Sequence, residues 1–492
     1  MLKNFFKKII HAGYSQLVWF CFFFVGVLYF SNLYGAVYLQ PDEARAFTLL
    51  GTGQFLAIIN YPVISIFKSE HSAFYLFAFF GLMNVVLFYY VVKDVFNKNI
   101  AFFSFLFFAV FPFNVNYIRS LYPVVFMEFF LILFFLYLYK FHNKKRLTTA
   151  FVLGLLAGML FFVHPVSYFV VLPAVGYFAF LFIQEKTTYE SLIKYFLILL
   201  TGIIAAVLFV ALACHLIDKN FDLWGGLFSV GGMTVHDAKM TDAVFLIKDL
   251  VRRCLRSRYE IVKSILTIFF IFSGIVLGIR NKDKYIRFVL FTVLGWLFFY
   301  FSLGFLEIVV VQYRHIIWLS LPFALFIGYV VSYNGLTGNV YRRRAVYLCA
   351  IILFGIFVFE DICIVRETFR KDVINSFLKE NNIRKDRLIT MLHLYEDDDA
   401  YYVSRVPTYV HRGKRLIAWP YLRKAYNAGL FDYIIPEGLG AYVTVGLKDP
   451  MFEGVKPVKT WPHPYKAYKY RHPYTNEDVS FNMYRLSDIF KD

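Results

Sequence analysis

The chain has 492 residues, of which 59% are hydrophobic and 17% are charged, whereas a typical soluble domain is nearer half apolar and a quarter charged. This balance excludes a disordered, collagen-like or coiled-coil protein, and it argues against a soluble globular one. The formal net charge of +18 could mean nucleic acid, but beside such hydrophobicity it more often reflects cytoplasmic loops and anionic lipid headgroups. We therefore take the chain to be an integral membrane protein.

Long apolar runs recur along the sequence, and each is long enough to cross a hydrocarbon core that needs about 20 helical residues. They predict about eleven transmembrane helices. The expected spans are residues 17–38, 73–92, 100–117, 122–139, 148–163, 166–183, 194–216, 262–279, 287–305, 312–331 and 345–363. Around His164-Pro165 one long run could instead be two shorter helices that meet outside the membrane. The first span lacks a small-residue cleavage site, so we expect it to be retained rather than removed as a signal peptide.

Basic residues between the spans orient the chain. If the N-terminus is inside, the inside loops hold Lys93, Lys98, Lys140, Lys144, Lys145, Arg146, Lys186, Lys194, Arg280, Lys282, Lys284, Arg287, Arg342, Arg343 and Arg344. The short outside loops hold only isolated cations such as Arg119 and Arg314. The positive-inside rule then places the N-terminus inside and, because the span count is odd, the C-terminus outside. The Phe-, Ile- and Lys-rich bias is compatible with a low-GC bacterium, so we expect the cytoplasmic (inner) membrane.

The predicted fold is mainly α, with a small α/β region at the end. Residues 1–365 form the expected transmembrane domain, with outer loops at about 39–72 and 218–261. Residues 366–492 are polar and rich in proline, and they predict a soluble extracytoplasmic α/β domain. Its expected elements are helices at 369–382 and 419–430 and strands at Leu388–Leu392 and Tyr433–Ile435. We interpret Thr460–Pro464 as a stiff connector.

The first outer loop carries two adjacent carboxylates, Asp42 and Glu43, directly after the first span. Carboxylates at a membrane boundary are costly unless they are solvated, paired or used. One of them could act as a general base on an acceptor hydroxyl or amine, or the pair could ligate a divalent cation. The alternative is a helix N-terminus, with Pro41 in the first turn and both carboxylates favoured by the helix dipole.

The sequence Asp42-Glu43-Ala44-Arg45 resembles the first outer loop of the GT-C superfamily of polyprenyl-phosphate-sugar-dependent glycosyltransferases. The nearest branch looks like the one that contains protein O-mannosyltransferases and the lipid A aminoarabinose transferase. Further similarities follow in the family's order at Gly53, Asn60–Pro62, Glu70–Phe74, Lys93–Phe96, Pro112–Arg119, Gly154–Gly158, His164-Pro165, Gln312–His315 with Pro322, and Phe431–Ile435. Each of these short similarities is weakly specific alone. They occur in the family's order and with its topology, and together they cover nearly the whole chain.

This resemblance implies sugar transfer from a polyprenyl-phosphate donor to a glycan, lipid or protein acceptor at the outer face of the membrane. It implies Asp42 as the base with Glu43 in support, and no nucleotide cofactor. The residues expected to bind the donor phosphate are Arg45, His164, Arg252, Arg256, Arg314 and His315. A divalent cation at the acidic pair stays open, because Val stands where relatives carry a second acidic residue in the loop between spans three and four. Glu128 lies further along, inside the expected fourth span.

Each expected phosphate ligand has a structural alternative. His164 stands where relatives often carry Lys or Arg, and it could equally be a structural histidine beside a proline kink. Arg252 and Arg256 belong to a basic stretch with helical spacing, which also suits a helix lying on anionic headgroups. Arg314 could be an ordinary snorkelling anchor.

Two other classes of function compete with the transferase. One is a transporter or flippase of lipid-linked sugars, although the paired broken spans typical of transporters are not clear in this sequence. The other is a GT-C-like protein without catalysis that serves as an assembly partner. In every case the expected partners include membrane lipids and exclude nucleic acid, because most of the positive charge lies in inside loops.

Overall fold

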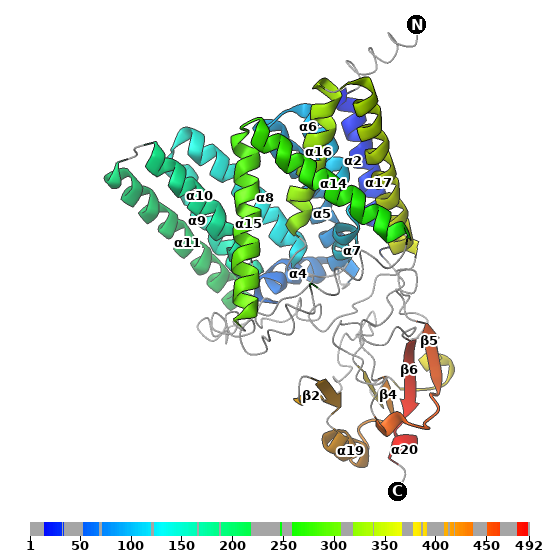
Figure 1. Ribbon diagram of the computed structural model, residues 1–492. Coiled ribbons are helices and arrows are strands. Elements are labelled where there is room, and N and C mark those ends of the chain that lie inside the picture. Colours follow the sequence, from blue (N-terminus) through cyan, green and yellow to red (C-terminus); the bar gives the residue numbers. More distant parts are fainter. Residues whose placement is uncertain are drawn as a thin grey trace.

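Figure 1 shows the computed structural model of the chain. It describes residues 14–31, 33, 53–67, 71–119, 123–164, 167–185, 188–217, 247, 258–306, 318–337, 339–366, 377–384, 387–390, 408–411, 414–417, 419–435, 450–462 and 480–490. The structural statements below concern these residues. A large helical bundle contains the N-terminal end, and a smaller unit with strands contains the C-terminal end (Figure 1).

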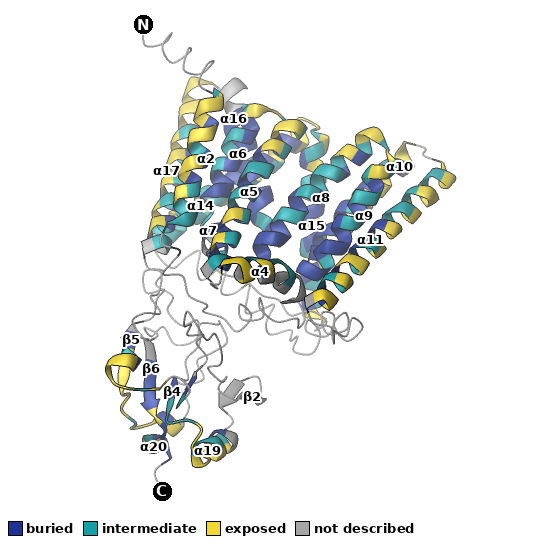
Figure 2. Cartoon of the chain, turned by 180° about the vertical axis from the view of Figure 1, so that it is seen from behind, coloured by how far each residue is buried: buried dark blue, intermediate teal, exposed yellow. Residues whose placement is uncertain are grey.

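Apolar helices with one continuous hydrophobic core form the bundle. They are α2 (Tyr14–Phe30), α4 (Gly53–Phe67), α5 (His71–Val95), α6 (Lys98–Ala109), α7 (Pro112–Ile118), α8 (Val124–Lys144), α9 (Leu147–Val163), α10 (Tyr168–Gln184), α11 (Tyr189–Ile217), α14 (Arg258–Arg280), α15 (Lys284–Phe305), α16 (Ser320–Thr337) and α17 (Val340–Arg366). Figure 2 shows that their exposed residues face outward. Large apolar side chains such as Phe196 and Phe272 lie on those outer faces, as expected for helices surrounded by lipid.

Six of the described helices are long and apolar enough to cross a membrane, namely α5, α8, α11, α14, α15 and α17. Shorter apolar helices occur in α2, α4, α6, α9, α10 and α16. The chain is therefore a multi-pass membrane protein with a mainly helical fold, as the sequence predicts. Each expected span except 100–117 overlaps one helix of the bundle, and the spans that correspond to α2, α9, α10 and α16 stay predictions. The break at His164-Pro165 is real, because α9 ends at Val163 and α10 begins at Tyr168.

The expected span at residues 100–117 is wrong as a single helix. α6 ends at Ala109, and the separate helix α7 begins at Pro112. Proline has no backbone N–H and disfavours a helical conformation at the residue before it, so Phe111 is extended and Pro112 starts a new helix. With 12 residues, α6 is only about 18 Å long, and the break places α7 inside the bundle.

The basic turns gather at one end of the bundle, the end where the described chain begins (Figure 1). The Tyr14 hydroxyl donates to the carbonyl of Lys98, and the Lys145 ammonium lies 2.8 Å from a carboxylate oxygen of Glu185. This hydrogen bond from Lys145 holds the pKa of Glu185 below its ordinary value. The turns that the sequence assigns to the inside therefore share one end of the bundle, which we call the basic end. We call the other end of the bundle the opposite end.

The C-terminal unit contains a four-stranded sheet in the order β1-β4-β6-β5. The strands are β1 (Leu388–Thr390), β4 (Tyr433–Ile435), β5 (Lys459–Pro462) and β6 (Ser480–Arg485), and a separate hairpin pairs β2 (Thr408–His411) with β3 (Lys414–Ile417). β1 and β4 are parallel, while β6 is antiparallel to both of its neighbours. Helices α19 (Trp419–Asn427) and α20 (Leu486–Ile489) and the short helix η6 (Pro450–Phe452) complete the unit.

Alternating side chains cover both faces of this sheet. Leu388 and Ile435 belong to one buried cluster, and their neighbours Ile389 and Ile434 belong to another, as the two-residue period of a strand requires. The Arg387 guanidinium joins the starts of β1 and β4 through two hydrogen bonds to Asp432, of 2.8 and 2.7 Å. The predicted strand at Tyr433–Ile435 and the predicted helix from 419 are confirmed, the helix ending at Asn427.

The expected connector at Thr460–Pro464 is wrong for its first three residues. Lys459–Pro462 form strand β5, whose Trp461 is buried against Phe377. A proline is tolerated there because β5 is the edge strand and Pro462 is its last residue.

The closest helix packing in the bundle involves two glycines, and it generates a test. A Cβ atom on Gly154 of α9 would overlap the carbonyl of Leu199 on α11, and one on Gly202 would overlap the carbonyl of Phe151. We expect Gly154→Ala to cost about 1–3 kcal/mol of stability, because backbone cannot move aside as a side chain can. Thermal unfolding of the purified protein in lipid nanodiscs measures the loss.

Gly176→Ala is the matched control for this variant. Gly176 also lies in an apolar helix, α10, but a Cβ atom there has open space around it. This substitution should leave the unfolding temperature unchanged or raise it slightly, since Ala favours helix over Gly. Equal destabilisation by the two substitutions would contradict the packing of α9 against α11.

Candidate functional site

Buried polar side chains collect where the helices of the bundle meet toward the opposite end. Arg119 follows α7 and donates to the carbonyl of Ser31, directly after α2. Asn114 of α7 donates from its amide nitrogen to the carbonyl of Phe108 at 3.0 Å, and the Tyr29 hydroxyl donates to the carbonyl of Ala109 at 2.8 Å. These bonds satisfy carbonyls at the end of α6 that the helix itself cannot pair.

Glu128 is the buried carboxyl group at the start of α8, with 2% of its surface exposed. The Ser320 hydroxyl at the start of α16 donates to its Oε1 atom at 3.0 Å. The Asn84 amide of α5 donates nearby, to the carbonyl of Val125 at 2.8 Å. Glu128 therefore lies inside the fourth span, as the sequence predicts, and its carboxyl group links α8 to α16 in the interior.

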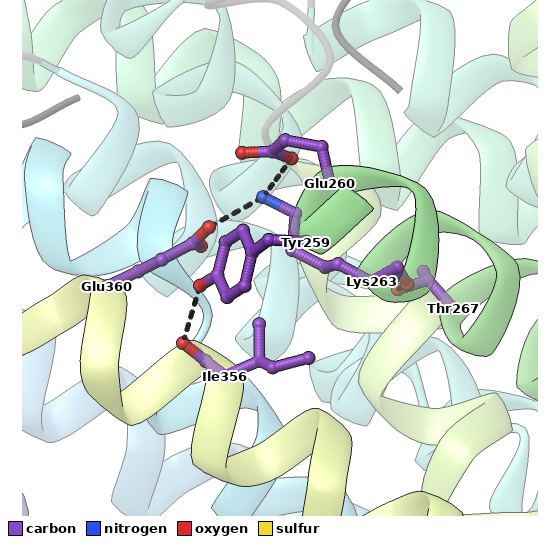
Figure 3. A network of polar contacts seen from close by, with 6 residues as sticks. All are labelled: Tyr259, Glu260, Lys263, Thr267, Ile356 and Glu360. Carbon is purple, nitrogen blue, oxygen red and sulfur yellow. Dashed lines mark hydrogen bonds and ion pairs between the residues drawn. The ribbon is translucent and has the colours of Figure 1, made fainter. Parts of the chain in front are cut away.

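A second acidic group lies where α14 begins and α17 ends. Figure 3 shows the Lys263 ammonium between two carboxylates, 2.6 Å from Glu260 and 2.7 Å from Glu360. Tyr259 adds a hydrogen bond of 3.2 Å from its hydroxyl to the carbonyl of Ile356 (Figure 3). This network ties the first turn of α14 to the last turns of α17.

Asp361 follows Glu360 but points elsewhere, since adjacent helical residues lie about 100° apart. Its side chain is fully buried, and neither carboxylate oxygen has a hydrogen-bond partner among the described residues. Asp361 is thus a buried acidic group on a different helix from Glu128.

His164 is the one expected phosphate ligand within the described part of the chain. It is buried at the end of α9, where its N–H donates to Leu160 and its carbonyl accepts from the N–H of Ser167. This backbone arrangement closes the turn between α9 and α10. The position agrees with a structural role, and binding of the donor phosphate by His164 stays a prediction.

The other predicted site residues lie outside the described residues. They are Asp42, Glu43, Arg45, Arg252, Arg256, Arg314 and His315. The segments that carry them connect α2 to α4, α11 to α14, and α15 to α16. Near the last connection, the ring of Trp318 contacts that of Trp296 at 5.4 Å, and α4 lies across the opposite end of the bundle (Figures 1 and 2). Because the flanking helices end there, each of these segments starts and ends at the opposite end of the bundle.

Sequence reasoning missed Asp361, Asn84 and the Lys263–Glu360 ion pair. The signal was present, because charged residues within an apolar run are costly in a membrane and mark functional or paired sites. Within the part of the chain that the structure describes, no group of three or more His, Cys, Asp or Glu side chains could hold a metal ion. A divalent cation at Asp42 and Glu43 stays a prediction.

Part of the chain is similar to a known protein family. Residues 57–215, from α4 to α11, match the family model described as dolichyl-phosphate-mannose-protein mannosyltransferase. This region is about a third of the chain, and through it the chain is similar to that family. These mannosyltransferase-like proteins are membrane glycosyltransferases of the GT-C type with a lipid-phosphate sugar donor, so the resemblance found in the sequence is confirmed. Glu128 and His164 both lie in the matched region.

Two solved structures of an archaeal enzyme are also similar to this chain. One is the Archaeoglobus fulgidus oligosaccharyltransferase tethered with an acceptor peptide containing the NVT sequon, with 11% identity, a TM-score of 0.45, and coverage of 81% of this chain and 60% of that one. The other is its apo form, with 13% identity, a TM-score of 0.38, and coverage of 80% and 57%. The chain thus covers 60% or less of the length of these chains. The comparison with curated proteins finds no match.

The ion pair in Figure 3 generates a test of the bundle's opposite end. Lys263→Met should destabilise the protein by about 2–3 kcal/mol, because it leaves Glu260 and Glu360 close together without a cation. The double variant Lys263→Met with Glu360→Leu should recover most of the loss. Thermal unfolding in nanodiscs measures both variants. A double variant less stable than the single one would contradict a direct pair.

Proposed function

We propose that the chain transfers a sugar from a polyprenyl-phosphate donor to an acceptor at the outer membrane–water boundary. The observation that carries this proposal is the family match over residues 57–215. The Asp42-Glu43 pair supports it, because the pair lies in the segment between α2 and α4, directly before the matched region. The acceptor is a hydroxyl or amine of a glycan, lipid or protein.

In the proposed reaction Asp42 is the general base. The acceptor oxygen or nitrogen forms a bond to the anomeric carbon of the donor sugar, and the bond between that carbon and the phosphate oxygen breaks. The acceptor proton moves to the Asp42 carboxylate, and polyprenyl phosphate leaves with the electron pair. Glu43 and Arg45 position the base, and a base held against the attacking group contributes typically 10²–10⁴-fold to such reactions.

The leaving phosphate needs fixed positive charge beside it. The proposed donors to its oxygens are Arg314, His315, Arg252 and Arg256, together with His164 at the end of α9. Arginine suits this role because its planar guanidinium forms two parallel hydrogen bonds to phosphate oxygens. Three segments far apart in sequence would then supply one phosphate site, all from the opposite end of the bundle.

Asp42→Asn tests the base. The variant should lose at least 100-fold in sugar transfer, because an amide cannot accept the acceptor proton. The assay uses the purified full-length chain with radiolabelled polyprenyl-phosphate sugars and extracted membrane acceptors. Asp94→Asn is the matched control, because Asp94 is an exposed carboxylate in the last turn of α5, at the basic end of the bundle. The Asp94→Asn variant should keep the sugar-transfer activity of the wild type. Full activity of Asp42→Asn would eliminate Asp42 as the base.

The same assay separates the proposal from its two rivals. A transferase forms labelled product in detergent solution, where no compartments exist. A transporter or flippase of lipid-linked sugars needs a sealed membrane to show its activity, and a non-catalytic assembly partner forms no product in either condition. Labelled product in detergent that requires the wild-type chain would exclude both.

The proposed orientation places the N-terminus inside and the C-terminal unit outside. A background without native cysteines allows single cysteines at Lys282, an exposed residue between α14 and α15, and at Lys424, an exposed residue of α19. A membrane-impermeant maleimide should label Lys424→Cys in intact cells and Lys282→Cys only after permeabilisation. The reversed pattern would invert the orientation and move the proposed site to the cytoplasmic face.

A further inference from the structure

A mainly apolar groove lies between α14 and α17 in the half of the bundle near the basic end. Three helices supply its lining, which includes Phe269 and Ser273 of α14, Val330 of α16, and Arg342, Ala345 and Cys349 of α17. The groove has a volume of about 270 Å³. An apolar cavity of about 150 Å³ is enough to hold benzene, so the groove has room for a longer piece of hydrocarbon.

The groove exists because α14 moves away from α17 along its length. At the opposite end the two helices are joined by the ion pair of Lys263 with Glu360 at 2.7 Å. Toward the basic end α14 packs on α16 instead, since a Cβ atom on Gly274 would lie 2.8 Å from the Cβ atom of Phe326. Figure 1 shows α14 crossing the bundle diagonally, away from α17. The buried Val330 of α16 closes the bottom of the wedge that opens between the two helices.

The groove faces the lipid rather than the protein interior. Phe269 in its wall is 43% exposed, and Phe272 and Leu348 beside it are exposed as well. Phe269 lies about 16 Å along α14 from Arg280, the last residue of that helix at the basic end. Half of a hydrocarbon core is about 15 Å thick. The groove therefore extends from the membrane surface at the basic end toward the middle of the bilayer, which is the reach of one acyl chain.

Positive charge lies at the mouth of the groove. Arg342, in the first turn of α17, is exposed and lines the groove, and within the described residues no carboxylate forms an ion pair with it. Arg343 and Arg344 follow it, and Arg280 and Lys284 lie at the same end of the bundle. A guanidinium forms two parallel hydrogen bonds to phosphate oxygens. The groove is therefore complementary to a molecule with a hydrocarbon chain and an anionic head.

We propose that this groove binds an anionic phospholipid from the leaflet at the basic end, with one acyl chain between α14 and α17 and its phosphate on Arg342. Basic pockets between transmembrane helices are a recurring type of site for anionic lipid head groups. An extended polypeptide suits the groove less, because its backbone polar groups would lack partners in hydrocarbon. The site lies away from the opposite end, where the segments with the proposed transfer residues start and end, so it does not depend on the proposed function.

Native mass spectrometry of the purified full-length chain, titrated with phosphatidylglycerol or phosphatidylcholine, measures the binding. The wild type should retain one phosphatidylglycerol per chain and bind phosphatidylcholine at least fivefold more weakly. Arg342→Gln should weaken phosphatidylglycerol binding about fivefold, which is the contribution of one basic residue near a membrane surface, and leave phosphatidylcholine binding unchanged. Ala345→Phe should weaken the binding of both lipids, because its ring fills the groove.

Two matched controls separate the groove from its surroundings. Arg344→Gln removes an exposed cation from the same turn of α17 that does not line the groove, and Leu348→Phe adds bulk to an exposed position beside it. Both should bind phosphatidylglycerol as the wild type does. If Ala345→Phe fails to fold, as judged by thermal unfolding, Cys349→Phe takes its place.

Three results would overturn the proposal. Equal losses in Arg342→Gln and Arg344→Gln would mean general attraction of anionic lipid to the basic end. Equal binding of the two lipids by the wild type would mean that the head group is not recognised. A dimer in the native spectrum that Ala345→Phe separates would assign the groove to a second copy of the chain.

Discussion

A carboxyl group inside a lipid-embedded bundle must be satisfied by the protein, because hydrocarbon supplies neither water nor counterions. The bundle meets this constraint in different ways at three acidic residues. Glu360 has the Lys263 ammonium as its counterion, and Glu128 accepts a hydrogen bond from the Ser320 hydroxyl. Asp361 has no such partner among the described residues. The packing of the helices toward the opposite end therefore depends on how each of these carboxyl groups is paired.

The break between α6 and α7 makes this interior possible. A helix of 12 residues cannot cross a hydrocarbon core of about 30 Å, so the chain turns at Phe111 and Pro112 within the bundle. The carbonyls left at the end of α6 attract the Tyr29 hydroxyl and the Asn114 amide. A single proline thus brings polar groups into a region that the apolar sequence would otherwise fill.

The sequence predicted what depends on local patterns. Apolar length identified the helices, and the turn at His164-Pro165 and the strand Tyr433–Ile435 followed from short-range signals. What it missed depends on partners far away in the chain. Lys263 and Glu360 are 97 residues apart, and the pairing of β5 with β6 crosses from Trp461 to Phe481, so no local pattern reveals them. For the predicted site, only His164 lies within the described residues, and its backbone hydrogen bonds would suit any residue at the end of a helix.

The division of charge between the two ends of the bundle bears on where transfer chemistry can occur. The basic end exposes many cations to water, and those cations orient the chain rather than bind a single phosphate. The proposed phosphate donors belong instead to segments whose flanking helices end at the opposite end of the bundle. A leaving phosphate gains most from a few fixed charges in a region of low dielectric constant, because each interaction is stronger there than in water. For a reaction that releases a lipid phosphate, a few fixed arginines in a region of low dielectric constant therefore make a better site than a dense basic surface.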